Sequence, residues 1–480
     1  MWGEAVFPPR NRQRGHPGRR HVPAVAAAVG CLLVALGAPA SAHAGLVGSQ
    51  PAPGVTVEAA PADVTLVFGE RIEPDFAQVR VLGPDGEAVD AGEPVVEGTR
   101  VRLPLDLGEQ PASGTYQVTF RVMTADGHSI ESAFPFNLAL STSPAATAPA
   151  HTSVAPDAQP AGFRGTAAAA LRIARFANYL AFTVVVGLLL GVAWLLADRG
   201  RILRYADRRV LRIGGWVAVA WAGTAVAMFV LGLADAAARP IAEVMRSGAL
   251  ARFAGSRFGG AVLAQAAVAV LVAVLAWRVR ARPGTWLALA VAALGGLAPA
   301  WWGHAGTSPT SMLAVVSAWA HGLAAAVWVG GLMAVVLLVL KPGSPDPLRS
   351  ARRFSRLAGW ALGVILATGL QNSLAHLGSL PNLIETSWGR LVLVKIALLT
   401  VVGWLGWVNR HRSLPLLAAG GGVTARRRFR RVALAEVGVM LVAFGTASRL
   451  ASSAPAELEA EAAARTRPVA TTLDNSSGAS

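Results

Sequence analysis

The stretch from residue 174 to residue 197, ARFANYLAFTVVVGLLLGVAWLLA, decides the architecture of this chain. A helix needs about 20 mostly apolar residues to cross the ~30 Å hydrocarbon layer of a membrane, and this stretch is long enough. Seven later stretches share its length and character: 212–234, 258–277, 285–302, 312–340, 357–377, 389–408 and 432–450. The sequence therefore predicts an all-α, polytopic membrane domain of about eight transmembrane helices over residues 168–451.

The composition agrees with a membrane protein. Of the 480 residues, 54% are hydrophobic and only 15% are charged, as long apolar segments require. The formal net charge of +16 does not indicate nucleic acid, because the basic residues lie in short groups between the apolar stretches. We expect the lipid bilayer, not nucleic acid, to be the partner of these basic and apolar segments. The sequence leaves protein partners open.

The basic groups also predict the orientation of the helices. They follow the first, third, fifth and seventh apolar stretches, as in 199–209, 278–282, 341–353 and 410–431. Loops rich in Lys and Arg stay on the cytoplasmic side of a membrane. The segment before the first span and the C-terminal tail are therefore expected outside the cytoplasm.

The N-terminus carries the pattern of an export signal. Several arginines precede an apolar run from Val22 to Leu36, and the small residues Ala40 and Ala42 follow it. This order is typical of a secretory signal peptide, predicted here as residues 1–42, with His43 as the first residue of the mature chain. The single cysteine, Cys31, lies in the signal segment. We expect a multi-pass protein of the plasma (inner) membrane with its N-terminal domain on the extracytoplasmic side.

Residues 43–140 have a different pattern. Short runs rich in Val, Thr and Phe, separated by Gly, Pro and Asp turns, predict strands at 64–68, 77–82, 100–103, 115–122 and 132–138. Several short strands in about 100 residues favour an all-β sandwich or Greek-key barrel. Residues 141–167 are rich in Ala, Pro, Ser and Thr and predict a flexible linker, and residues 452–480 predict a disordered tail.

Three residues of this β domain are candidate metal ligands. A free α-amine and the imidazole of an N-terminal His43 can chelate one ion, and copper(II) favours nitrogen ligands in a tetragonal arrangement. Asp126 and His128 lie two residues apart around Gly127, where a hairpin is predicted to turn, so both side chains can converge on one point. The alternative is an ordinary Asp-Gly hairpin with a surface histidine.

The β domain resembles the periplasmic copper-binding family CopC. The resemblance rests on HAGLVGSQPAPG from His43 to Gly54, VTLVFGE from Val64 to Glu70, and GTYQVTFRVMTADGH from Gly114 to His128. It implies an immunoglobulin-like β-sandwich and copper(II) binding by His43, Asp126 and His128. Some members hold copper(I) in a methionine-rich loop, but this domain has only Met123, so a second site is not expected.

The apolar spans carry ionisable side chains, which are costly in a bilayer and therefore mark candidate functional positions. His304 and His376 are predicted at the external ends of two helices, and His321 deeper within the outer half of the bilayer. Met312 and Met333 flank His321 in sequence and carry thioethers that suit copper(I). The alternatives are interfacial anchoring, interhelical hydrogen bonding and packing. Glu436 lies near the cytoplasmic end of the last helix, where the alternatives are an exit ligand, a proton acceptor and a structural partner of an arginine, and we expect the last of these.

The membrane domain resembles the copper resistance family CopD. The similar segments are GHA from Gly303 to Ala305, HGLAAAVWVGGL from His321 to Leu332, RFSRLA from Arg353 to Ala358, and TSWGRLVLVKIAL from Thr386 to Leu398. The resemblance implies copper movement across the inner membrane, generally inward. It also implies a copper-ligand role for His304 and His321, which lie in the matching motifs. The order of the two domains resembles fused CopC–CopD proteins.

The sequence therefore predicts a non-enzymatic copper-binding and copper transport protein. The exported sandwich would capture copper(II) and pass it to the helical bundle, with import as the expected direction. Two alternatives remain open: a membrane haem-type redox protein, since paired histidines on membrane helices can be axial ligands, and surface sequestration of copper for resistance.

Overall fold

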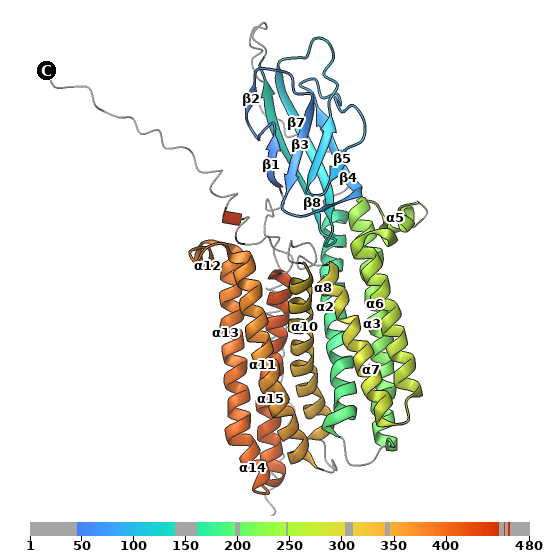
Figure 1. Cartoon of the computed structure of the whole chain (residues 1–480), viewed down its shortest axis with the longest axis vertical. Coiled ribbons are helices and arrows are strands. Elements are labelled where there is room, and N and C mark those ends of the chain that lie inside the picture. Colours follow the sequence, from blue (N-terminus) through green and yellow to red (C-terminus); the bar gives the residue numbers. More distant parts are fainter. Residues whose placement is uncertain are drawn as a thin grey trace, which may run out of the picture.

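The structure of the chain is a computed structural model that describes residues 46–139, 161–196, 202–245, 248–302, 311–340, 346–450, 456 and 459–460. A β-sandwich stands on one end of a long helical bundle (Figure 1). This arrangement confirms the predicted fold class. The signal segment, His43, most of the linker and most of the tail lie outside the described residues.

The N-terminal domain consists of two four-stranded sheets. One sheet has the order β1-β3-β6-β5 and the other has the order β2-β8-β7-β4. The strands are β1 (Leu46–Gln50), β2 (Thr56–Val57), β3 (Asp63–Phe68), β4 (Ile72–Leu82), β5 (Val95–Glu97), β6 (Arg100–Pro104), β7 (Gly114–Thr124) and β8 (Ser129–Leu138).

Alternating side chains of the two sheets form the core of the sandwich. In β3, for example, Val64, Leu66 and Phe68 are at most 2% exposed while the residues between them are partly exposed. Successive side chains of a strand point to opposite faces, so this alternation places one apolar row of each strand between the sheets. Aromatic pairs fill the interior, including Phe68 with Phe120 in an edge-to-face contact at 5.5 Å.

The C-terminal domain is helical. Its longer helices are α2 (Ala161–Leu190), α3 (Tyr205–Ala237), α6 (Arg257–Arg278), α7 (Arg282–Gly295), α10 (Ser311–Ala334), α11 (Pro347–Leu377), α13 (Ser387–Val408) and α15 (Gly422–Leu450). Shorter helices are α4 (Ile241–Val244), α5 (Ala249–Gly255), α8 (Leu297–Trp302), α12 (Asn382–Glu385) and α14 (Leu414–Ala418). The π-helical segments η1 (Gly191–Leu195), η2 (Val335–Val339) and η3 (Asn409–Ser413) extend three of the longer helices.

Seven helical segments within the described residues are long and apolar enough to cross a membrane. They coincide with the first seven predicted spans. The eighth predicted span, 432–450, lies inside α15, which is as long as the others but is not one of the seven. Helix α2 begins at Ala161, within the segment predicted to be linker.

Close contact between α2 and α10 holds the centre of the bundle together. Gly187 of α2 faces Gly330 of α10, and a Cβ atom on Gly330 would lie 2.2 Å from the carbonyl oxygen of Thr183. Small residues allow membrane helices to approach to backbone contact. On either side of this contact, α2, α3, α6 and α7 share one apolar core, and α10, α11, α13 and α15 share another.

Candidate metal centre

The predicted Asp126–His128 turn is the tip of the β7–β8 hairpin. The amide of Thr124 donates to the His128 carbonyl at 2.8 Å, and the amide of Gly127 donates to the Thr124 carbonyl at 2.8 Å. Gly127 has φ of +78°, a conformation that residues with a Cβ rarely adopt. The sequence Asp-Gly-His therefore closes the turn and brings both side chains to the same side.

Asp126 and His128 contact each other directly. The carboxylate oxygen Oδ2 of Asp126 lies 2.6 Å from Nδ1 of the His128 ring. The other oxygen, Oδ1, accepts hydrogen bonds from the Thr124 hydroxyl and from the His128 amide. Asp126 is only 2% exposed, while the His128 side chain is 29% exposed. A carboxylate in this position fixes the orientation and tautomer of an imidazole.

The second ring nitrogen of His128 faces the membrane domain. Nε2 of His128 lies 2.7 Å from Nη1 of Arg175, which is on α2. Nη2 of the same guanidinium donates to the Gly127 carbonyl at 3.1 Å. One arginine of the first membrane helix therefore contacts both the ring and the backbone of the predicted metal-binding turn.

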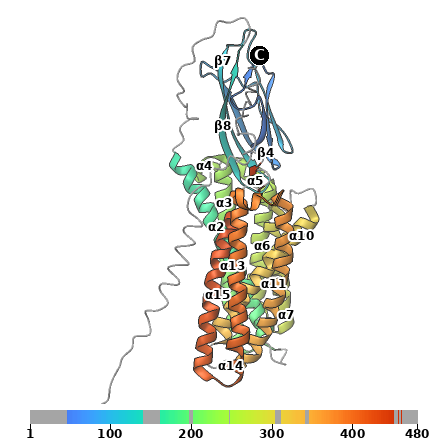
Figure 2. The same ribbon diagram turned by 90° about the vertical axis from the view of Figure 1, so that its left-hand side faces the viewer.

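Apolar packing joins the same hairpin to the bundle. Gly127 lies against the ring of Phe258 on α6, so that a Cβ on Gly127 would come within 2.5 Å of that ring. Met123 of β7 and Phe76 of β4 share a buried cluster with Phe258 and Phe253. The hairpin end of the sandwich is thus the end that meets the membrane domain, as both views show (Figures 1 and 2).

Polar contacts surround this apolar junction. Arg121 of β7 binds both the carbonyl and the carboxylate of Asp235 on α3. Glu73 of β4 accepts a hydrogen bond from the amide of Arg257, the first residue of α6, at 3.2 Å. Burial raises the pKa of Glu73 above its usual value, and nearby Asp75 adds to this effect. The hydrogen bond from Arg257 partly offsets it.

Within the bundle, His321 of α10 bonds to α11. Its Nδ1 lies 2.9 Å from the Thr368 hydroxyl, and that hydroxyl donates to the Val364 carbonyl at 2.6 Å. A hydroxyl has a single proton, so Thr368 accepts from the Nδ1–H of His321. The lone pair of the imidazole then lies on Nε2, and this nitrogen can ligate a metal ion.

The other predicted membrane residues lie at different levels. His376 is in the last turn of α11, where its ring meets Trp388 at 6.3 Å. Met312 is 70% exposed near the start of α10, and Met333 packs near its end. With a rise of 1.5 Å per helical residue, Met312 and Met333 stand roughly 30 Å apart. The two methionines therefore cannot ligate one ion together with His321. Their role as separate ligands along a copper path through the bundle stays a prediction.

The described residues contain no group of three or more His, Cys, Asp and Glu side chains arranged to hold a metal ion. Asp126 and His128 lie together as predicted. The proposed third member, His43, is outside the described residues, and so is His304. The role of all these residues in binding copper stays a prediction.

Two features were not predicted. Arg175 was not identified as a site residue, although a charged residue inside the first apolar span is a signal that could have found it. Glu436 was expected to pair with an arginine, and this was wrong. Its partner is the Trp328 indole, whose Nε1 donates at 3.1 Å, because Glu436 is buried within the bundle, away from the arginines at the start of α15.

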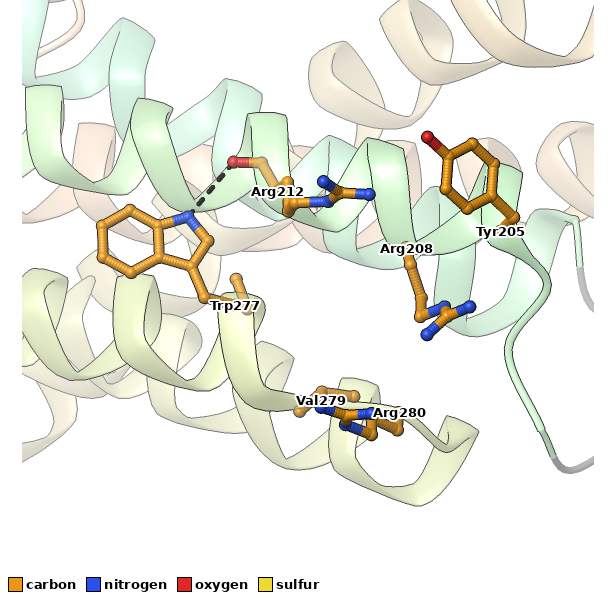
Figure 3. Close-up of a pocket in the computed structure, with 7 residues that line it drawn as sticks. Tyr205, Arg208, Arg212, Trp277, Val279 and Arg280 are labelled. Carbon is orange, nitrogen blue, oxygen red and sulfur yellow. Dashed lines mark hydrogen bonds between the residues drawn. The ribbon is translucent and has the colours of Figure 1, made fainter.

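A cavity of about 160 Å³ lies at the end of the bundle that is far from the sandwich. It is bordered by the start of α3 and the end of α6 (Figure 3). Its lining includes Tyr205, Arg208, Arg212, Trp277 and Arg280. None of the predicted copper residues lies in it.

A two-sheet sandwich whose Asp-Gly-His hairpin rests on a multi-pass helical bundle defines a class of two-domain membrane protein. Three family profiles match the chain in order: the CopC domain at 46–139, the copper resistance protein D-like N-terminal domain at 166–312, and copper resistance protein D at 348–450. The chain therefore belongs to the copper resistance and transport proteins in which a CopC domain is fused to a CopD membrane domain.

The similarity to individual proteins covers either most of this chain or about one fifth of it. Copper transport protein CutJ of Bacillus subtilis is 27% identical over 390 residues, which cover 77% of this chain and 68% of that protein. Protein YobA of Escherichia coli is 32% identical over 98 residues, 20% of this chain and 79% of that protein. The solved structure of CopC from Methylosinus trichosporium OB3b is 27% identical, with a TM-score of 0.19, over 21% of this chain and 97% of that one.

Proposed function

We propose that the chain captures copper(II) with its sandwich outside the cytoplasm and passes the ion into the helical bundle for import. The observation that carries this proposal is the position of the Asp126–His128 turn. It lies on the membrane domain, in contact with Arg175 of α2 and Phe258 of α6. A sandwich that only stored copper has no need to hold its ligand hairpin against membrane helices.

The capture step uses nitrogen and oxygen donors. The α-amine and imidazole of an N-terminal His43, together with His128 and Asp126, offer the borderline and hard donors that suit copper(II). Support comes from the hairpin, which fixes Asp126 and His128 at 2.6 Å from each other. The mature N-terminus completes the set in this proposal.

The receiving step uses the histidines of the bundle. His321 offers Nε2 from a position held by Thr368, and it lies on α10, which packs against α2. His304 and His376 are proposed at the entrance, with Met312 and Met333 at further levels of the path. Thioethers suit copper(I), so the methionines assist only if the ion is reduced.

The distribution of the basic residues supports the proposed orientation. The segments with Arg208, Arg280 and Arg352 lie at the end of the bundle opposite the sandwich (Figure 1), and such segments stay in the cytoplasm. The sandwich then faces outward, which places capture before the membrane step and makes import the natural direction.

Purified full-length protein in proteoliposomes tests this proposal. Copper uptake is measured with copper(I) and copper(II) supplied separately, for the wild type and for His321→Ala, with exposed His411→Ala as the control. We expect uptake by the wild type and the control and loss in His321→Ala. Equal uptake in all three would overturn the membrane path, binding without uptake would indicate sequestration, and a strong Soret absorption band would indicate a haem protein.

A further inference from the structure

We infer that Arg175 competes with copper for His128, so that the docked and the copper-loaded sandwich exclude each other and docking releases the ion at the membrane domain. This inference rests on the proposed function, because it assumes that His128 ligates copper. It goes beyond that function by assigning the release step to one residue of the first membrane helix.

The hydrogen bonds of the turn show which ring nitrogen of His128 has a lone pair available for a metal ion. Because Asp126 accepts from Nδ1 of His128, the lone pair of the neutral ring lies on Nε2. A guanidinium has only donors, so Arg175 donates to that same lone pair at 2.7 Å. While Asp126 holds Nδ1, a metal ion can reach the ring only through this lone pair, and one lone pair cannot serve both partners. Joint ligation of one ion by Asp126 and His128 requires that their direct contact opens first.

Arg175 is held in this position by further contacts. Its Nη2 donates to the Gly127 carbonyl at 3.1 Å, and its guanidinium lies over the Phe258 ring at 5.4 Å. The contact with Gly127 exists only when the hairpin is docked, because Gly127 belongs to the sandwich, whereas Arg175 and Phe258 both belong to the bundle and hold each other in place there. A copper ion on Nε2 would also place its positive charge against the guanidinium.

Competition of this kind is reciprocal by thermodynamic linkage: if docking weakens copper binding by some factor, copper weakens docking by the same factor. A loaded sandwich then stays away from α2, and a docked one gives up its ion beside the bundle. The linker between the domains keeps an undocked sandwich at high effective concentration beside the bundle.

The test measures the copper(II) affinity of the full-length protein by competition with a chelator. Arg175→Ala removes the competing donor, and we expect it to bind copper(II) at least tenfold more tightly than the wild type. Arg172→Ala, which removes a partly exposed arginine from the same helix, is the matched control and should bind as the wild type does. An affinity in Arg175→Ala that is unchanged or weaker overturns the inference.

A second variant keeps Arg175 and weakens docking elsewhere. Asp235→Asn removes the carboxylate that binds Arg121 and should also tighten copper(II) binding. In the wild type, copper(II) should increase hydrogen exchange of the backbone around residues 257–259, and equal exchange with and without copper would contradict the competition. If the wild type binds no copper(II), the proposed function itself fails. That outcome is distinct from failure of the competition alone, in which the wild type and Arg175→Ala bind copper(II) equally well.

The cavity at the far end of the bundle carries a second, independent inference. We propose that it binds a phosphate-bearing anion, as in the headgroup of an anionic lipid. In the described part of the chain, the guanidinium groups of Arg208, Arg212 and Arg280 have no ion-pair partner. Arg208 projects from α3 toward the segment that carries Arg280 (Figure 3).

Aromatic residues place this cavity at the level of lipid headgroups. Trp277 is 40% exposed, packs edge-to-face on Trp216 at 5.2 Å, and donates to the Arg212 carbonyl at 3.3 Å. Exposed Trp side chains gather at the membrane interface, and basic pockets there bind anionic headgroups. The nearby acidic Asp207 interacts with Arg204 instead, so it does not neutralise the cavity.

Native mass spectrometry of the full-length protein tests this site. The protein is incubated with phosphatidylglycerol, with phosphatidylcholine, or with phosphatidylglycerol plus inorganic phosphate. We expect retained phosphatidylglycerol only, and at least a fivefold loss in Arg208→Gln/Arg280→Gln but not in the control Arg427→Gln/Arg430→Gln. Displacement by inorganic phosphate would assign the site to a free anion. Equal retention of both lipids, or equal loss in both variants, would overturn the site.

Discussion

Trp328 and Glu436 are 108 residues apart in the sequence but are joined by a 3.1 Å hydrogen bond inside the helical bundle. Trp328 is 4% exposed and Glu436 is 2% exposed. The indole N–H therefore satisfies one oxygen of a carboxyl group that water does not reach. This bond connects α10, which carries His321, with α15.

Replacing Trp328 with Phe removes the donor and keeps most of the apolar ring. An unsatisfied buried acceptor costs about 1–3 kcal/mol, so we expect the free energy of unfolding to fall by roughly that amount. Thermal unfolding in detergent measures the change. Trp360→Phe is the control, because Trp360 is 78% exposed and should leave the melting temperature unchanged. Equal melting of all three proteins would contradict a structural role for the bond.

Gly330→Ala tests the contact of α2 with α10. The new Cβ would lie 2.2 Å from the Thr183 carbonyl oxygen and 2.9 Å from the Gly187 Cα, and backbone atoms cannot move aside as a side chain does. Overpacking of this kind costs about 1–3 kcal/mol or more. On α11, Gly363→Ala meets nothing within 4 Å and should be neutral or slightly stabilising. A Gly330→Ala protein as stable as the wild type would show that the helices are less close.

Hydropathy predicted the helices well in their centres and less well at their ends. The span predicted at 212–234 belongs to α3, which begins at Tyr205 because Arg204 and Asp207 form a capping interaction there. Such polar turns continue a helix beyond the membrane without adding apolar residues. The strands β1, β2 and β5 were not predicted. For β2 and β5 the reason is their length, since two or three residues are too few to show an alternating pattern.

The candidate site also has one part that the sequence predicted and one part that it did not. The Asp126–His128 turn is local, so the sequence order Asp-Gly-His was sufficient to predict the hairpin and the meeting of the two side chains. The contact of Arg175 with His128 depends on how the sandwich docks on α2. No periodicity in either domain encodes that arrangement, and the sequence analysis did not single out Arg175. Its charge within an apolar helix was the one signal in the sequence that could have done so.

Extending the mature N-terminus tests the capture site directly. Two residues added before His43 separate the free α-amine from its imidazole, so the chelate cannot form. We expect copper(II) affinity to fall by orders of magnitude, and His128→Ala to weaken it as well. The control is His411→Ala, since His411 is exposed and bonds to the Trp407 carbonyl. Unchanged affinity in the extended protein would place the copper site elsewhere.

Glu73 makes docking of the sandwich depend on pH. Burial against α6 raises the pKa of its carboxyl above the usual value of 4.5, so the docked state holds this proton more tightly than an undocked sandwich. A carboxyl with a raised pKa favours docking fully below its usual pKa, and this contribution is lost as the pH rises through the raised value. The contribution of Glu73 to docking should therefore be larger in acid than at neutral pH.

Glu73→Gln isolates this contribution, because the amide stays neutral and its oxygen can still accept from the Arg257 amide. Hydrogen exchange around residues 257–259, corrected for intrinsic rates, reports docking. We expect protection to fall more in the wild type than in Glu73→Gln as the pH rises from 4.5, the usual pKa of the carboxyl, to neutral. The exposed-residue control Glu87→Gln should behave as the wild type does. A Glu73→Gln protein that loses protection like the wild type would show that Glu73 does not govern the response.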